Sequence, residues 1–344
     1  MLAAASAMSR PGVVVVGGML LLDHVALLPE LPGPGETVRA RDLHYQYSTP
    51  RPGGCSANIA VAATRAGAAT TLLAVTATDA EALEYQAYLR RTGICVDYLI
   101  IDRGRSTPRC YTWYAPDGTK YACMDELRPV DAIGAVPPGD EAGEVIDDCA
   151  AVVLVGGGED DSMRDIHAQV AERASRGGSR VVLAICGTPR PVDQELLRTS
   201  DAVIGNELEI AAATAQTGCR TEAQLAREAG VTLFVTRGSK GSRVCEPGAR
   251  SRDVAAIDVS SAIDPTGAGD AYAGGVAVAL ARGATAVEAA CFGTALASFA
   301  VERTGAQTRA PRNHEIVERF ETAFSGTIPE WLAASAGAAS GSRQ

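Results

Sequence analysis

The stretch AIDPTGAGDAYAGGVAVALARG, from Ala262 to Gly283, places a glycine loop and an aspartate at the start of an apolar helical run. The backbone N–H groups of Gly267, Ala268 and Gly269 can converge there, and the positive end of the helix favours an anion beside them. Asp270 follows at once. A carboxylate at this position either caps the helix or takes a proton from a hydroxyl that attacks the bound anion. The residues alone leave both interpretations open.

Short apolar runs alternate with segments of helical spacing through most of the chain. The runs are nearly continuous, as in strands of a parallel sheet covered on both faces. We expect strands at Val13–Val16, Thr71–Val75, Val152–Val155, Arg180–Ala184, Ala202–Ile204 and Thr232–Thr236. We expect helices at Ser56–Ala66, Ala80–Thr92, Met163–Ser175, Glu207–Ala215 and Glu222–Ala229, several of them closed by a glycine, namely Gly67, Gly93, Gly177 or Gly230. The alternation predicts an α/β fold with a doubly wound, mostly parallel sheet and helices on both faces.

Polar residues and glycines follow several of these strands or begin the next helix. They are Asp23, Asn58, Asn206, Glu209, Gly238 and Gly241. Because ligands of α/β proteins bind outside the carboxyl ends of the strands, we expect these residues to gather at one edge. Each also has a simpler interpretation: Asn206 caps its helix, the two glycines form a hairpin turn, and Asp23 is solvated.

Two segments depart from the alternation of strand and helix. Gly35–Ser48 alternates polar and apolar residues, and Ser106–Asp125 has the pattern of strand, Pro-Asp-Gly turn and strand that predicts a hairpin. Either they are ordinary edge strands, or they form a small β lid over a site.

The composition describes a large globular chain and excludes several classes of protein. With 344 residues, 47% of them hydrophobic, the chain can bury a substantial core. A net charge of −10 argues against a nucleic-acid or anionic-membrane surface. The nine cysteines form no CxxC pair, which favours reduced thiols, and the four histidines lack metal-ligand spacing, so no zinc site is predicted.

Familiar nucleotide and hydrolase motifs are missing from the chain. No GxxxxGK[ST] sequence occurs, which excludes a P-loop, and GAGDAY lacks the third glycine of a dinucleotide fingerprint. There is also no GxSxG elbow and no HExxH pair.

Taken together, the motifs resemble those of the ribokinase-like (PfkB-type) carbohydrate and nucleoside kinases, roughly from Val13 to Phe320. DPTGAGDAYAGG is similar to that family's C-terminal signature, and RPGGCSANIAVAATRAG to its N-terminal one. LPELPGPGETV resembles the segment that leads into the lid, NELE the N-x-x-E motif, and VTRGSKGS the glycine turn on the nucleotide side.

The resemblance implies a role for each matching residue. Asp270 would be the general base, and the N–H groups of Gly267, Ala268 and Gly269 would stabilise charge on the transferring phosphoryl group. The acceptor would be held by Asp23, Gly53, Gly54 and Asn58, and the nucleotide by Asn206, Glu209, Thr236, Gly238 and Gly241. Glu209 would organise Mg²⁺ through water, and Asp264 matches a position that binds a monovalent cation such as K⁺ in some members.

The chain departs from the family pattern at three places. Many members carry Asp-x-Asn-x-Arg where this chain reads ICGTPRP, with Cys186 in place of the aspartate. Pro265 occupies the second position of the C-terminal signature. TATDAEA keeps Asp79 but lacks the glycine that often precedes it.

The interpretation we carry forward is an ATP-dependent, Mg²⁺-requiring kinase that phosphorylates a hydroxyl of a small ribose- or fructose-like sugar. A nucleoside kinase of the same family is the alternative, because Tyr111, Trp113 and Tyr114 could stack a base; otherwise they pack the lid or a dimer interface. Two readings of other classes are a regulatory or ligand-binding protein on a kinase scaffold, and a hydrolase in which Asp270 activates water.

The domain organisation follows from the same patterns. We expect a disordered N-terminus over residues 1–11, one kinase domain over 12–325 with lid segments at about 35–50 and 105–125, and a mostly disordered tail over 326–344. No apolar run is long enough to span a membrane. We expect a cytoplasmic protein that handles a small molecule, and the resemblance allows a homodimer formed through the lid.

Overall fold

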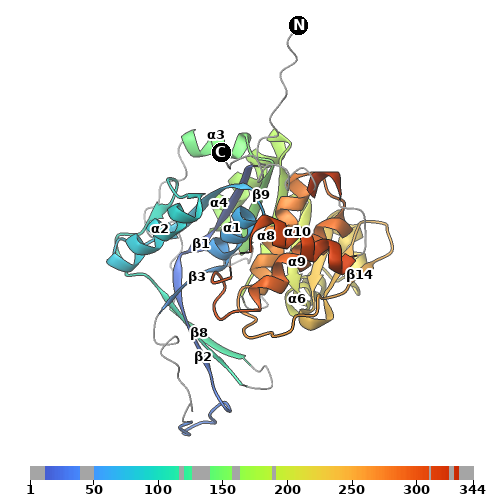
Figure 1. The fold of residues 1–344 in the computed structure, drawn as a ribbon. Helices are drawn as coiled ribbons and strands as arrows, with labels where there is room; N and C mark the ends of the chain where they lie inside the picture. The colour runs from blue at the N-terminus through green and yellow to red at the C-terminus, as the bar shows by residue number, and fades with distance from the viewer. Residues whose placement is uncertain are drawn as a thin grey trace, which may run out of the picture.

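The main sheet of the computed structural model has ten strands in the order β14-β13-β12-β11-β10-β9-β1-β4-β5, with β6 also paired to β4 (Figure 1). The structure describes residues 12–38, 50–115, 120–125, 140–156, 163–187, 191–309, 311–324 and 329–332. The strands are β1 (Gly12–Met19), β4 (Ala69–Thr76), β5 (Ile94–Cys95), β6 (Ile100–Ile101), β9 (Ala151–Gly156), β10 (Arg180–Ile185), β11 (Ala202–Asn206), β12 (Thr232–Thr236), β13 (Ser242–Cys245) and β14 (Arg252–Val254). Pairing is parallel from β12 across to β5 and β6, and antiparallel between β12, β13 and β14. The predicted fold class is confirmed.

Helices cover both faces of this sheet, and two apolar clusters fill the spaces between. The helices are α1 (Cys55–Arg65), α2 (Ala80–Thr92), α3 (Asp140–Asp147), α4 (Arg164–Gly177), α5 (Gln194–Thr199), α6 (Glu207–Gln216), α7 (Glu222–Ala229), α8 (Ala268–Ala281), α9 (Ala286–Ala300) and α10 (Asn313–Phe324). Along β1, Val13 and Val15 join the cluster under α1, α8 and α9, whereas Val14 and Val16 join the cluster under α4 to α7. Side chains of a strand point alternately to its two faces, so a continuous apolar run buries both.

The helix ends follow the predicted glycine signals with one correction. Gly93 and Gly230 close α2 and α7 in the left-handed conformation, as predicted. Helix α4 runs to Gly177, two residues beyond the predicted end at Ser175, and the left-handed closing residue is Gly178 rather than the predicted Gly177. Two adjacent glycines cannot be told apart by sequence, because either one tolerates a positive φ. No helix in the described ranges is both long and apolar enough to cross a bilayer.

A second sheet of four strands, in the order β3-β2-β7-β8, projects from one end of the molecule (Figure 1). The predicted hairpin is confirmed as β7 (Arg109–Tyr114) and β8 (Lys120–Met124). The strand parallel to β7 is β2 (Leu21–Leu27), which the sequence analysis did not predict, and β3 (Arg51–Gly53) completes the sheet. Of the predicted segment at 35–50, residues 39–49 lie outside the described residues. We call these four strands the lid sheet.

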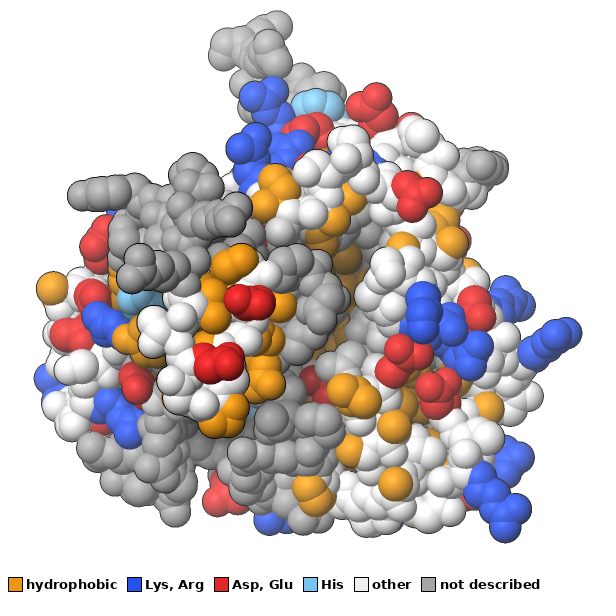
Figure 2. Space-filling view, turned by 90° about the horizontal axis from the view of Figure 1, so that it is seen from below, with side chains coloured by type: hydrophobic (Ala, Val, Ile, Leu, Met, Phe, Trp, Pro, Cys, Tyr) orange, Lys and Arg blue, Asp and Glu red, His pale blue; other side chains and the backbone are white. Residues whose placement is uncertain are grey.

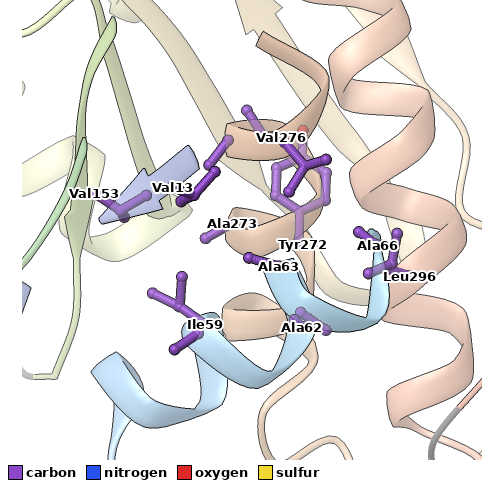
Figure 3. Close-up of a cluster of buried hydrophobic side chains, with 14 of the residues drawn as sticks. Val13, Ile59, Ala62, Ala63, Ala66, Val153, Tyr272, Ala273, Val276 and Leu296 are labelled. Atoms are coloured by element: carbon purple, nitrogen blue, oxygen red, sulfur yellow. The ribbon is translucent and has the colours of Figure 1, made fainter. Parts of the chain in front are cut away.

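Helices α1 and α8 pack closely because small residues line their contact (Figure 3). Ile59, Ala62 and Ala63 of α1 face Tyr272 and Ala273 of α8, and all five are buried. A Cβ atom on Gly274 would lie 2.8 Å from both the Cβ of Ala62 and the carbonyl oxygen of Ile59. Glycine at this position therefore sets how closely the two helices approach.

Asp79 connects the start of α2 to the segment that enters the lid sheet. Its carboxylate caps α2 by accepting the N–H of Ala82 at 2.9 Å, and it accepts the N–H and hydroxyl of Thr107, each at 2.6 Å. Burial would raise the pKa of Asp79, but the hydrogen bonds from Thr107 and Ala82 outweigh it and lower that pKa below its usual value. The aspartate kept in TATDAEA thus has a structural role here.

We expect Gly274→Val to lower the free energy of unfolding by about 1–3 kcal/mol, because the added side chain overpacks the α1–α8 contact. Urea denaturation measures the change. Gly269→Val is the control on the same helix, since a Cβ there meets no atom within 4 Å. Equal losses in the two variants would contradict the packing argument.

We expect Asp79→Ala to lower the free energy of unfolding by about 1–2 kcal/mol at pH 7 through loss of the helix cap. The folded-state pKa is depressed, so the contribution is present above the unfolded value of about 3.9 and is lost as pH falls through the folded value. The difference in the free energy of unfolding between wild type and Asp79→Ala should therefore shrink as pH falls from about 5 toward about 3. Asp97→Ala, at a residue whose side chain is 75% exposed, is the control. A gap that is independent of pH would refute the assignment.

Candidate active site

Helix α8 begins at a tight turn that only glycine allows. Gly267 is the N-cap residue with φ 79°, and a Cβ there would lie 2.3 Å from the Cβ of Ala306. The ladder of α8 begins where Ala271 donates to the carbonyl oxygen of Gly267. The N–H of Ala268 donates to Pro265 at 3.1 Å, so it serves the loop itself. The first turn of the helix presents the positive end of the helix dipole to any anion placed there.

Asp264 holds this loop against the chain that follows α9. One of its oxygens accepts the N–H of Thr266 at 2.9 Å, and the other accepts the N–H of Gly305 at 2.8 Å. Asp264 is 1% exposed. These two bonds make Asp264 an anchor of the loop, and its role at a monovalent cation such as K⁺ stays a prediction.

Asp270, in the first turn of α8, accepts a hydrogen bond from the side-chain amide of Asn58 in the first turn of α1. The distance between Asn58 Nδ2 and Asp270 Oδ2 is 2.7 Å. Of the two interpretations left open by the sequence, a carboxylate that only caps its helix does not account for this partner 212 positions away. The contact requires the α1–α8 approach that Gly274 permits.

A buried network holds Asn58 in this orientation. Gln307 donates through Nε2 to Asn58 Oδ1 at 2.7 Å and to the hydroxyl of Tyr85 at 2.8 Å, and that hydroxyl donates to the carbonyl oxygen of Gly53 at 2.7 Å. Burial raises the pKa of Tyr85 well above its usual value, and the charges of Asp23 and Asp270 add to this effect. Sequence reasoning missed Gln307 and Tyr85, because neither lies in a motif.

Asp23 enters the same region from the lid sheet. A Cβ on Gly53 would lie 2.1 Å from Asp23 Oδ2, so the glycine leaves room for the carboxylate. The hydroxyl of Tyr114 lies 3.0 Å from that of Thr266, which joins the lid sheet to the loop before α8. The structure thus brings together five residues singled out in the sequence: Asp23, Gly53, Gly54, Asn58 and Asp270.

Only one of the three lid aromatics faces this region. Successive residues of β7 point to opposite faces, and Tyr114 points toward Thr266, so Tyr111 and Trp113 lie on the other face. There the ring of Tyr111 stacks on His24 with centroids 4.7 Å apart and lies 6.5 Å from Trp113. The predicted aromatic wall for a base is therefore reduced to Tyr114. Figure 2 views the molecule from the lid end and shows a hollow beside the lid sheet, with hydrophobic side chains inside it.

The residues expected at the nucleotide lie farther along the same sheet edge. Asn206 caps α6 in a capping box: its side chain accepts N–H bonds from Leu208 and Glu209, and Glu209 accepts the N–H of Asn206 at 2.7 Å. The simpler interpretation of Asn206 thus holds as a structural fact. Thr236 pairs with Asn206 at the ends of β12 and β11.

Gly238 and Gly241 form the turn between β12 and β13, as the simpler interpretation predicted. Gly241 has φ 87°, and a Cβ there would lie 2.0 Å from the carbonyl oxygen of Val254. Next to this contact is a pocket with mostly apolar walls. It is lined by Asp253, Val254, Ala255, Ala256, Ile257, Asp258, Val287, Cys291, Ala323 and Phe324.

Two thiols lie beside Asp270. Cys55 is the first residue of α1, and Cys186 follows β10 directly. A hydrogen bond with Cys186, burial and the charge of Asp270 together raise the pKa of the Cys55 thiol well above its usual value. Cys186 was noted in the sequence as a departure from the family pattern, whereas Cys55 was not singled out.

Comparison with known proteins connects this site to a family. The family model described as pfkB family carbohydrate kinase matches residues 11–313. A nucleoside kinase of Methanothermobacter thermautotrophicus is 28% identical over 91% of this chain and 97% of its own length. A ribokinase of Haemophilus influenzae is also 28% identical, over 90% of this chain and 99% of its own.

Solved structures share the fold. The ribokinase of Arabidopsis thaliana, in complex with ribose and ATP, superposes with a TM-score of 0.70 at 24% identity and covers 91% of this chain and 99% of its own. The nucleoside kinase of Burkholderia thailandensis, in complex with inosine, gives 0.74 at 19% identity and covers 92% and 98%.

We expect Gln307→Met to lower the free energy of unfolding by about 1–3 kcal/mol, because Asn58 and Tyr85 each lose a buried donor. Urea denaturation measures the loss. The control is Gln194→Met, which removes a hydrogen bond to Arg198 on the surface of α5 and should cost less than about 0.5 kcal/mol. Similar values for both variants would show that the network does not stabilise the fold.

Proposed function

The chain belongs to the pfkB family of carbohydrate kinases and is an ATP-dependent kinase, and we propose that it transfers the γ-phosphoryl group of ATP to a hydroxyl of a small sugar. The single observation that carries this proposal is the position of Asp270. Its carboxylate lies in the first turn of α8, at the end of the helix dipole that favours an anion, and bonds to Asn58 of α1 at 2.7 Å.

Asp270 acts as the general base in this proposal. It takes the proton of the acceptor hydroxyl as that oxygen attacks the γ-phosphorus, in line with the leaving ADP oxygen. Asn58 holds the carboxylate, and Gln307 fixes Asn58 in turn. The N–H groups of Gly267 and Gly269 stabilise the charge that grows on the phosphoryl oxygens. Ala268 contributes less than the sequence suggested, because its N–H already bonds to Pro265.

The nucleotide lies along the ends of β11 and β12 in the same proposal. Its phosphates extend from α8 toward Thr236, Gly238 and Gly241, and its base enters the apolar pocket next to Gly241. Glu209, with Asn206, would hold Mg²⁺ through water, since carboxylate and water oxygens are the ligands this ion takes. Mg²⁺, when bound, neutralises phosphate charge. Glu209 is 5% exposed, and its carboxylate already accepts the N–H of Asn206, which fits a role through water rather than direct contact.

The acceptor side favours a sugar over a nucleoside. Asp23, Asn58 and the backbone at Gly53 and Gly54 offer polar groups suited to several hydroxyls, and Asp23 reaches them from the lid sheet. Among the described residues of the lid sheet, Tyr114 is the aromatic side chain that points toward the site. A nucleoside kinase is the second candidate, because relatives of both kinds, a nucleoside kinase and a ribokinase, are 28% identical to this chain.

The outward face of the lid sheet suggests how two copies would associate. His24, Tyr111 and Trp113 stack there, and Tyr111 is 39% exposed. We propose that this face forms the interface of a homodimer, since aromatic side chains are enriched at such interfaces.

The test is ADP release by the purified protein with Mg-ATP across pentoses, hexoses and nucleosides. We expect a sugar to stimulate release. We expect Asp270→Asn to retain ATP binding and lose at least about 10²-fold in kcat with that acceptor. Asp97→Asn is the control for loss of an acidic residue far from the site.

Each other result selects a competing reading. Stimulation only by a nucleoside would replace the sugar with that class. ADP release at the same rate with and without any acceptor would indicate a hydrolase. ATP binding with no ADP release would indicate a regulatory protein on this scaffold. Near-normal turnover in Asp270→Asn would overturn the base assignment.

A further inference from the structure

Cys55, Cys186 and Asp270 form a group with three metal-ligating atoms at the carboxyl edge of the main sheet. The two sulfur atoms and a carboxylate oxygen all lie within 4.8 Å of one another. The residues come from the start of α1, the end of β10 and the first turn of α8. Among the residues that the structure describes, this is the one such group.

The geometry of the group matches what a tetrahedral zinc ion needs. Zinc–sulfur bonds are about 2.3 Å and zinc–carboxylate bonds about 2.0–2.2 Å, which places neighbouring ligand atoms roughly 3.4–3.8 Å apart. Side chains that already lie within 4.8 Å reach such spacing by small rotations. Three protein ligands leave the fourth position to water, as in other open zinc sites.

The donor set also selects the kind of metal. Two thiolates and one carboxylate suit Zn²⁺ and related borderline cations, whereas Mg²⁺ takes oxygen ligands. The site is therefore chemically distinct from the Mg²⁺ position assigned to Glu209. The sequence analysis predicted no zinc site from histidine spacing, and it had no means to see two distant thiols meet.

We propose that Cys55, Cys186 and Asp270 bind Zn²⁺ and that the bound ion inhibits the enzyme. Both thiols lose a proton on binding, so two protons are released for each Zn²⁺ taken up and no electron changes hands. An oxygen of Asp270 that is bonded to zinc cannot accept the proton of an acceptor hydroxyl. The inhibition rests on the proposed role of Asp270, but the binding does not.

The binding test uses Co²⁺ as a spectroscopic probe for Zn²⁺ in the full-length, reduced protein. We expect one equivalent of Co²⁺ to produce thiolate-to-cobalt charge-transfer absorption and the visible bands of a tetrahedral ion, and Zn²⁺ to abolish both. Cys55→Ser and Cys186→Ser should each weaken Co²⁺ binding by at least about 10-fold. Loss of a residue that only supports a metal ligand already lowers metal affinity by about this factor, and loss of a ligand should lower it further. Circular dichroism checks that each variant is folded.

Cys95→Ser is the matched control. Its thiol also lies near a carboxylate, that of Asp97 at 3.8 Å, but it belongs to no three-ligand group in the described chain. Its cobalt spectrum should equal that of the wild type. Absence of thiolate bands in the wild type, or equal bands in Cys186→Ser, would overturn the site.

The inhibition test follows acceptor-dependent ADP release at fixed Mg-ATP while Zn²⁺ is added. We expect Zn²⁺ to inhibit wild type and Cys95→Ser alike, a chelator to restore activity, and Cys186→Ser to need at least about 10-fold more Zn²⁺ for the same inhibition. Cobalt binding in an enzyme that Zn²⁺ leaves active would uphold the site and overturn the inhibition. A protein without kinase activity would fail the proposed function, while the cobalt spectrum would still decide on the site.

Discussion

The close approach of α1 and α8 is the contact on which the site depends. Gly274 removes the side chain that would otherwise meet Ile59 and Ala62, so the starts of the two helices reach hydrogen-bonding distance. Asn58 Nδ2 of α1 then lies 2.7 Å from Asp270 Oδ2 of α8 and donates a hydrogen bond to it. The geometry of the candidate site is thus a consequence of core packing, because interiors are too dense to absorb an added methyl group without moving.

Two further ties place the lid sheet relative to that pair of helices. Asp79 binds the segment before β7 through Thr107, and Tyr114 contacts Thr266 in the loop before α8. Asp23 is carried by the strand next to β7, so these ties also decide where its carboxylate stands. Rigid elements on both sides hold polar groups aimed at the same small volume, which is the arrangement that preorganised catalysis requires.

Local patterns were enough to predict much of the fold and to single out residues that the structure brings together, among them Asn58 and Asp270. All six predicted strands and all five predicted helices are present within a few residues, because apolar periodicity and terminal glycines are local signals. Tertiary contacts were beyond reach. Strand β2 was missed because its partner β7 lies far along the chain. The aromatic wall was predicted without knowing which face of β7 points toward the site. Gln307 and the Cys55–Cys186 pair belong to no sequence motif, so no local signal marked them.

The Asn58–Gln307 hydrogen bond joins residues 249 positions apart, so one partner is synthesised early and the other late. A nascent chain on the ribosome can form β1 and α1 long before Gln307 emerges. Folds dominated by such distant contacts form slowly, because the chain loses conformational entropy in closing the long loop before the contact can stabilise it. The alignment of Asn58 should accordingly be among the last features that the growing polypeptide acquires, and a chain released early would carry Asn58 without the side chain that holds it.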